Sequence, residues 1–166
     1  MNNYNVFDGT MAEDFNLTTG QVARMLGIDH VTVQQWCNRH LIRFESEAAG
    51  RRSWRRIHCG ELPRLVLAAQ LWRNQLLISD AFEMANHIIS RLRDPKKSRV
   101  EYIFYFIGDD AKILYLGYRS QFELNSADPI ADAFRRYQRA ACVMISVTEL
   151  GRQIDAAVKG SLPSDA

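Results

Sequence analysis

The sequence has few cysteines and no long apolar run, and both absences narrow the class of protein. Its 166 residues include three cysteines, Cys37, Cys59 and Cys142, scattered along the chain, which are too few for the disulfide framework of a small secreted domain. The sequence contains no run of about 18 apolar residues, the length that a membrane-spanning helix needs. Its N-terminus lacks the basic and apolar segments of a signal peptide. We therefore expect a cytoplasmic protein without membrane contact.

The second half of the chain lacks the residues on which most enzymes depend. All four histidines lie before residue 100, and no glycine-rich phosphate loop follows them. The paired acids Asp109 and Asp110 stand between two apolar runs, where turn formation is the ordinary role of aspartate. The sequence therefore predicts no enzymatic activity and no cofactor.

The most informative segment, residues 17–57, predicts two short helices around a tight turn, followed by a basic β-hairpin. Thr18 or Thr19 can cap the first helix, whose apolar residues recur at helical spacing. Gly27 ends it, because glycine readily adopts the left-handed conformation of a helix terminus. Inward positions are expected at Val22, Ala23, Leu26, Ile28, Val33, Trp36 and Leu41.

The hairpin that follows is basic. Residues 50–56, GRRSWRR, place four arginines around Trp54. Guanidinium groups can bond phosphate oxygens in pairs, while the tryptophan packs the hairpin against the helices. Residues 18–73 hold nine arginines against four acids, a local excess of five positive charges that the whole-chain value of +2 hides. Such an excess favours a nucleic-acid partner.

At these positions the chain resembles the MerR-like DNA-binding domains of bacterial regulators, and more loosely the excisionases of similar fold. The resemblance covers about residues 17–90 and rests on Thr18, Val22, Ala23, Leu26, Gly27, Ile28, Thr32, Val33, Trp36, Leu41, Ile42, Trp54, Arg55 and Leu62. Gln34 and Gln35 stand where that family usually has an arginine and an aromatic residue, and Ile57 where its hairpin usually ends in tyrosine. The resemblance implies a winged helix-turn-helix fold, but not the individual base contacts.

A DNA interface follows from this layout. The second helix would enter the major groove and the hairpin, as a wing, would contact phosphates. The expected DNA-binding residues are Thr19, His30, Thr32, Gln34, Gln35, Arg39, Arg51, Arg52, Ser53, Trp54, Arg55 and Arg56.

A zinc site is the competing interpretation of this segment. Cys37 and His40 could be combined with His58 and Cys59 as a Cys₂His₂ set. No second CxxC or HxxxH spacing supports it, and a small buried residue beside Trp36 explains Cys37. We therefore predict no metal.

Two further helices and a change of periodicity follow. Residues 61–75 and 81–93 each carry an apolar stripe. Residues 100–107 and 112–118 predict a hairpin, residues 129–140 a helix, residues 141–148 a strand, and Thr148 the cap of a last helix. The fold class is α+β: a MerR-like winged helix-turn-helix followed by a small β-β-α-β-α domain.

The expected organisation has five parts. A flexible arm at 1–16 precedes a DNA-binding domain at 17–94 and a basic linker at 95–99. A dimerisation or sensing domain at 100–160 precedes a flexible tail at 161–166. The strand at 100–107 is apolar on both faces, so it is either central in a sheet or covered by another chain. The expected dimer-interface residues are Tyr102, Phe104, Tyr105 and Phe106.

The function expected from the sequence is that of a sequence-specific bacterial or phage transcriptional regulator, binding double-stranded DNA as a homodimer. RNA polymerase or another protein is a further possible partner. Two alternatives stay open: an excisionase-like or architectural DNA-binding protein, and an adaptor that uses the winged helix for protein contacts.

Overall fold

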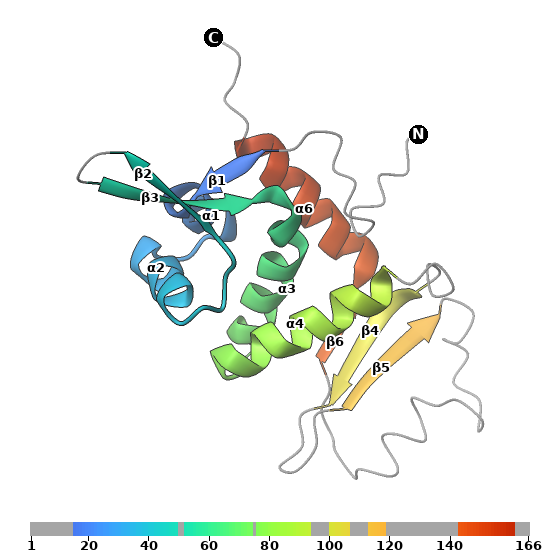
Figure 1. The fold of residues 1–166 in the computed structure, drawn as a ribbon. Helices are drawn as coiled ribbons and strands as arrows, with labels where there is room; N and C mark the ends of the chain where they lie inside the picture. The colour runs from blue at the N-terminus through green and yellow to red at the C-terminus, as the bar shows by residue number, and fades with distance from the viewer. Residues whose placement is uncertain are drawn as a thin grey trace, which may run out of the picture. The chain divides into compact units, whose positions relative to one another are not determined.

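The computed structural model describes residues 15–49, 52–74, 76–93, 100–106, 113–118 and 143–161 (Figure 1). The chain divides into two compact units. One contains the described residues up to Ser90 together with those from Gly151 onward, and the other runs from Arg91 to Leu150. Helices and antiparallel sheets alternate without a parallel sheet among these residues, so the fold class is α+β.

The first unit begins with two short helices, α1 (Thr19–Leu26) and α2 (His30–Asn38). Thr18 caps α1 in a reciprocal arrangement: its hydroxyl accepts the Gln21 N–H at 3.2 Å, while Gln21 Oε1 accepts the Thr18 N–H at 2.8 Å. Asp29 caps α2 by accepting the Val31 N–H at 2.6 Å. These caps satisfy amides that the helices leave without partners, and they confirm the cap expected at Thr18.

Both helices end in the same way. Gly27 (φ 61°) and His40 (φ 56°) are in the left-handed conformation. The following N–H groups bond back into the helix, Ile28 to the Ala23 carbonyl at 3.0 Å and Leu41 to the Trp36 carbonyl at 3.0 Å. This is the Schellman ending, in which glycine usually occupies the left-handed position. The end of α2 therefore has a histidine where the backbone favours glycine.

Replacing His40 with glycine is expected to raise the free energy of unfolding by about 0.5–1 kcal/mol, because it removes the left-handed strain of a residue with a β-carbon. Gly27→Ala should lower it by about 1–2 kcal/mol for the converse reason. A β-carbon at Gly27 would lie 3.5 Å from Arg73 Nη2, an ordinary contact, so the loss is conformational. Urea unfolding measures both. The control is His40→Ala, which keeps the β-carbon. If it raised the free energy of unfolding as much as His40→Gly does, left-handed strain would not be the cause.

A three-stranded antiparallel sheet accompanies the helices. Its order is β1 (Asn16–Thr18), β3 (Arg52–His58) and β2 (Glu45–Ala49). The hairpin β2–β3 confirms the predicted hairpin, but β1 was not predicted. Asn16, expected in a flexible arm, pairs with His58, and the Phe15 carbonyl accepts the Cys59 N–H at 3.0 Å. Three residues are too few to show strand alternation, so only the partner strand defines β1.

Helix α3 (Leu62–Arg73) is the centre of this unit's core. The sequence predicts one apolar stripe, and that stripe is buried. However, Leu67, Ala68 and Leu71 on its other faces are also buried, because further helices surround it (Figure 1). Pro63 stands in the first turn, where no amide partner is lost. Helix α4 (Ile78–Leu92) buries the stripe predicted for it: Phe82, Ala85, Ile88, Ile89 and Leu92.

The last helix, α6 (Val147–Ser161), belongs to the first unit from Gly151 onward. Ile154 is completely buried, and Gln153 Oε1 accepts a hydrogen bond from Gln70 Nε2 on α3. This division differs from the expected domain boundary, which places the whole helix in a C-terminal domain at 100–160. Sequence order alone does not show that a C-terminal helix returns to the core of an N-terminal unit.

The second unit contains a three-stranded antiparallel sheet of order β5-β4-β6. Strands β4 (Val100–Phe106) and β5 (Ile113–Tyr118) form the predicted hairpin, and β6 (Val143–Ser146) is the predicted third strand, shortened. The last helix starts two residues earlier than expected, and its cap is Ser146, not Thr148, since Ser146 Oγ accepts the Glu149 N–H at 3.2 Å. The expected helix at 129–140 and the linker at 95–99 lie outside the described residues.

Candidate nucleic-acid interface

Helix α2 has one buried and one exposed face. Val33, Trp36 and Cys37 are buried, while Thr32 is half-buried. Residues at helical spacing form the other face, which we call the α2 stripe: His30, Val31, Gln34, Gln35 and Asn38, all exposed. The predicted contacts His30, Gln34 and Gln35 therefore lie together, and Arg39 is exposed just beyond the helix. Sequence reasoning missed Val31 and Asn38, although the same helical spacing places them there.

The buried face fixes α2 to the core. Trp36 is only 3 % exposed, and its ring meets Trp72 edge-on at 5.7 Å and Phe82 edge-on at 5.3 Å. These are favourable geometries for aromatic pairs, and they join α2 to both α3 and α4. The α2 stripe is consequently held on a rigid support. Leu41, predicted to point inward, is only half-buried, and Ile42 fills the core in its place.

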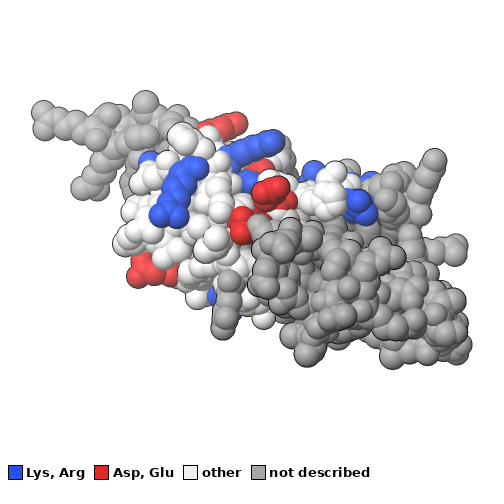
Figure 2. Space-filling view, turned by 90° about the horizontal axis from the view of Figure 1, so that it is seen from below, with Lys and Arg blue, Asp and Glu red and all other residues white. Residues whose placement is uncertain are grey.

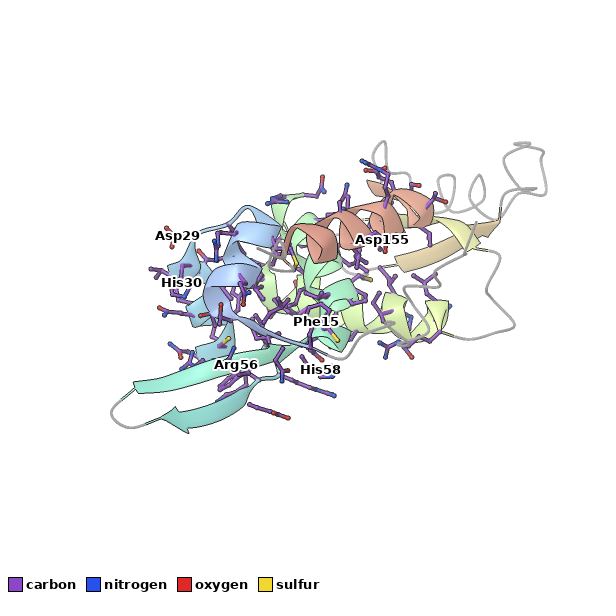
Figure 3. All side chains as sticks on the ribbon, turned by 90° about the horizontal axis from the view of Figure 1, so that it is seen from above. Phe15, Asp29, His30, Arg56, His58 and Asp155 are labelled. Atoms are coloured by element: carbon purple, nitrogen blue, oxygen red, sulfur yellow. The ribbon has the colours of Figure 1, made fainter. Side chains whose placement is uncertain are left out.

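The N-termini of α1 and α2 meet at one end of this surface. Thr19 Oγ1 and His30 Nε2 lie 2.8 Å apart and share a hydrogen bond. Asp29 and His30 project side by side from this end of the unit (Figure 3). Both side chains of the hydrogen-bonded pair belong to the predicted DNA contacts, so the fold brings together two residues that are eleven positions apart in sequence. Helix N-termini also favour anions such as phosphate.

One arginine of the basic hairpin, Arg55, has partners within the protein. Arg55 donates to Asn38 Oδ1 at 2.6 Å and to the Gln34 carbonyl at 3.3 Å. Its guanidinium also lies over the Phe44 ring, 4.9 Å from the centroid. Arg55 thus fastens β3 to the C-terminal half of α2. The structure gives it partners within the protein, and the phosphate contact expected of it stays a prediction.

The other predicted contact residues of the hairpin that the structure describes lie in β3. Arg52, Ser53 and Trp54 lie in β3, paired with Ala49, Ala48 and Glu47 of β2. Arg56 is half-buried on β3 near the base of the hairpin (Figure 3). Arg51 lies outside the described residues, so the phosphate contacts expected at Arg51 and Arg52 stay predictions.

Two further arginines of the local basic excess also have partners within the protein. Arg64 forms an ion pair with Glu61, and Arg73 donates to the carbonyls of Leu26 and Gly27, which end α1. On the face shown in Figure 2, basic and acidic side chains are interspersed. Both guanidinium groups keep their charge, so these contacts give the two arginines a structural role without changing the local excess of arginines over acids.

Cys37 is buried next to Arg55, in surroundings typical of a structural cysteine. Burial raises the pKa of the Cys37 thiol, and the Arg55 guanidinium offsets part of that rise. The thiol is therefore neutral at physiological pH and poorly nucleophilic. Cys59 is also buried. In the described segments, no group of three or more histidine, cysteine, aspartate or glutamate residues is arranged to hold a metal ion.

The expected dimer residues lie in β4, the central strand of its sheet. Of the two explanations for a strand with two apolar faces, central placement is confirmed. Strand β5 pairs with β4 as far as Phe106, and β6 pairs with it from Tyr102 to Tyr105, so a partner would meet Tyr102, Phe104 and Tyr105 across a sheet face. Within the part of the chain that the structure describes, no helix has the length and apolar character needed to span a bilayer.

Comparison with known proteins shows a similarity for part of the first unit. A family model described as a helix-turn-helix domain matches residues 17–66, which comprise α1, α2, the hairpin β2–β3 and the start of α3. No match to the chain was found among curated proteins. The matched segment is thus similar to helix-turn-helix domains, which supports a DNA-binding family. The match does not distinguish a MerR-like domain from other helix-turn-helix domains.

Proposed function

We propose that the protein is a sequence-specific transcriptional regulator of bacterial or phage type, with a MerR-like winged domain, acting on double-stranded DNA in the cytoplasm and not as an enzyme. The observation that carries this proposal is the α2 stripe. It presents amides and an imidazole on a helix held at fixed orientation by Trp36. Amide side chains can form paired hydrogen bonds to an adenine edge in the major groove.

The hairpin β2–β3 supports the same proposal. Arg55 holds it against α2, so a duplex docked on α2 lies within reach of the hairpin. We propose that it acts as a wing, with Arg52 and Arg56 near the DNA backbone. Phosphate contacts of this kind set register and affinity without reading sequence.

We further propose that the protein binds as a homodimer, through the second unit. A single helix-turn-helix makes few base contacts, and regulators of this type usually pair two half-sites about one helical turn apart. Tyr102, Phe104, Tyr105 and Phe106 are the residues proposed for that contact. RNA polymerase or another protein is a proposed further partner.

Selection of binding sites from random and genomic duplexes tests the function, and the symmetry of the selected motif reports the oligomeric state. Gln34→Ala should then cost on the order of 1–3 kcal/mol at one base pair only, because one amide reads one base edge. Mobility shifts on duplexes that carry single changes measure the loss. As a matched control, Asn86→Ala removes an exposed amide on α4 and should leave binding unchanged.

The same experiment separates the alternatives. An architectural or excisionase-like protein is indicated if selection yields DNA with weak sequence preference that the protein bends. An adaptor that uses this surface for protein contacts is indicated if no duplex is retained at physiological salt.

A further inference from the structure

Val31 is an exposed apolar residue in the middle of a polar surface. Among the residues whose side chains the structure describes, three large apolar ones are exposed: Val31 at 56 %, Trp72 at 37 % and Leu77 at 71 %. Trp72 has a packing partner in Trp36. Val31, in contrast, lies in the first turn of α2, on the α2 stripe. An isolated exposed valine is ordinary on a protein surface, so its neighbours decide what it can do.

The position of Val31 is fixed by the residues around it. Asp29 accepts the Val31 N–H at 2.6 Å, and the neighbouring His30 is held by Thr19 at 2.8 Å. A β-branched side chain in a helix has one strongly preferred rotamer. The two methyl groups of Val31 therefore project from a rigid helical turn at one defined place.

The polar neighbours of Val31 indicate which base pair suits it. Gln34 and Gln35 follow at three and four positions, the spacings that bring helical side chains together, and both are exposed. A·T base pairs present two features in the major groove: an adenine edge that an amide can bond in a paired fashion, and a thymine methyl that an apolar side chain can contact. A valine beside a glutamine matches both features.

We propose that Val31 is a specificity-determining residue that contacts the 5-methyl group of a thymine, next to an adenine bonded by Gln34 or Gln35. This inference rests on the proposed DNA-binding function and names the base pair that the first turn of α2 selects. Contact between the valine and thymine methyl groups removes apolar surface from water, which neither cytosine nor uracil can reproduce because both lack that methyl.

Replacing thymidine with deoxyuridine tests the proposal, because the two nucleosides differ only by the 5-methyl group of the base. The probe is the duplex selected by the full-length protein, with each thymine replaced by deoxyuridine in turn. At one thymine per half-site, replacement should weaken binding about fourfold, the effect of one buried methyl group. Val31→Ala should lose affinity for the thymine duplex and show no further loss with deoxyuridine at that place, since a double-mutant cycle isolates this pair.

Two variants serve as controls. Val31→Thr keeps one methyl group and should retain part of the preference for thymine. Leu77→Ala removes another exposed apolar side chain, outside α2, and should preserve the full deoxyuridine effect. Because Val31 is exposed, far-UV circular dichroism of its variants should match that of the parent protein.

Other outcomes overturn the proposal in distinguishable ways. If a selected duplex binds tightly but no thymine responds to deoxyuridine, or if the losses from Val31→Ala and deoxyuridine simply add, the contact does not exist although DNA binding does. If selection yields no duplex, the DNA-binding function fails as well.

Discussion

Trp36→Ala is expected to lower the free energy of unfolding of the first unit by about 3–5 kcal/mol, the range for truncating a buried aromatic side chain. Trp36 is 3 % exposed and contacts Trp72 and Phe82 edge-on. Removing it opens a cavity where α2, α3 and α4 meet. Since this is a large share of the stability of a typical domain, specific DNA binding should be lost with it. Urea unfolding followed by far-UV circular dichroism measures the change.

Trp72→Ala is the matched control. It removes the other indole of the pair, but Trp72 is 37 % exposed, so the loss should be about 1–2 kcal/mol, from one aromatic contact and partial burial. Equal losses for the two variants would show that Trp36 has no special role in anchoring α2.

Arg55→Ala is expected to weaken DNA binding about tenfold or more without changing its salt dependence. The guanidinium bonds Asn38 and the Gln34 carbonyl, and hydrogen bonds to a charged group contribute about 1.5–3 kcal/mol. Their loss frees the hairpin β2–β3 from α2. A residue that instead contacts phosphate reduces the slope of log K against log salt by about one when it is removed. Mobility shifts at several salt concentrations measure both quantities.

Arg55→Lys sharpens this test. Lysine keeps the charge but lacks the planar fork that reaches two acceptors and covers Phe44, so we expect it to behave like alanine. Arg39, exposed beyond α2, provides the comparison: Arg39→Ala should reduce the salt slope by about one. If Arg55→Lys binds DNA as tightly as the parent protein and Arg55→Ala reduces the salt slope, Arg55 contacts phosphate and does not fasten the hairpin.

Local sequence signals predicted much of this fold. The cap at Thr18, the left-handed turn at Gly27 and the inward positions Val33 and Trp36 all follow from interactions within a few residues. The hairpin of β4 and β5 follows from two apolar runs on either side of a turn. The exposed positions of Gln34 and Gln35 follow from helical spacing in the same way. Each depends on backbone geometry that neighbouring residues set by themselves.

The sequence by itself thus determined the helix-turn-helix, the cap of its first helix, the stripes of its helices and the polar side chains presented by α2. Only the tertiary structure decided that Arg55 fastens the hairpin to α2, that β1 joins the sheet, and that Ile154 returns to the first unit's core. These contacts join residues far apart in the chain. An arginine side chain can donate to a phosphate or to a carbonyl, and which acceptor it reaches depends on how the separate elements pack.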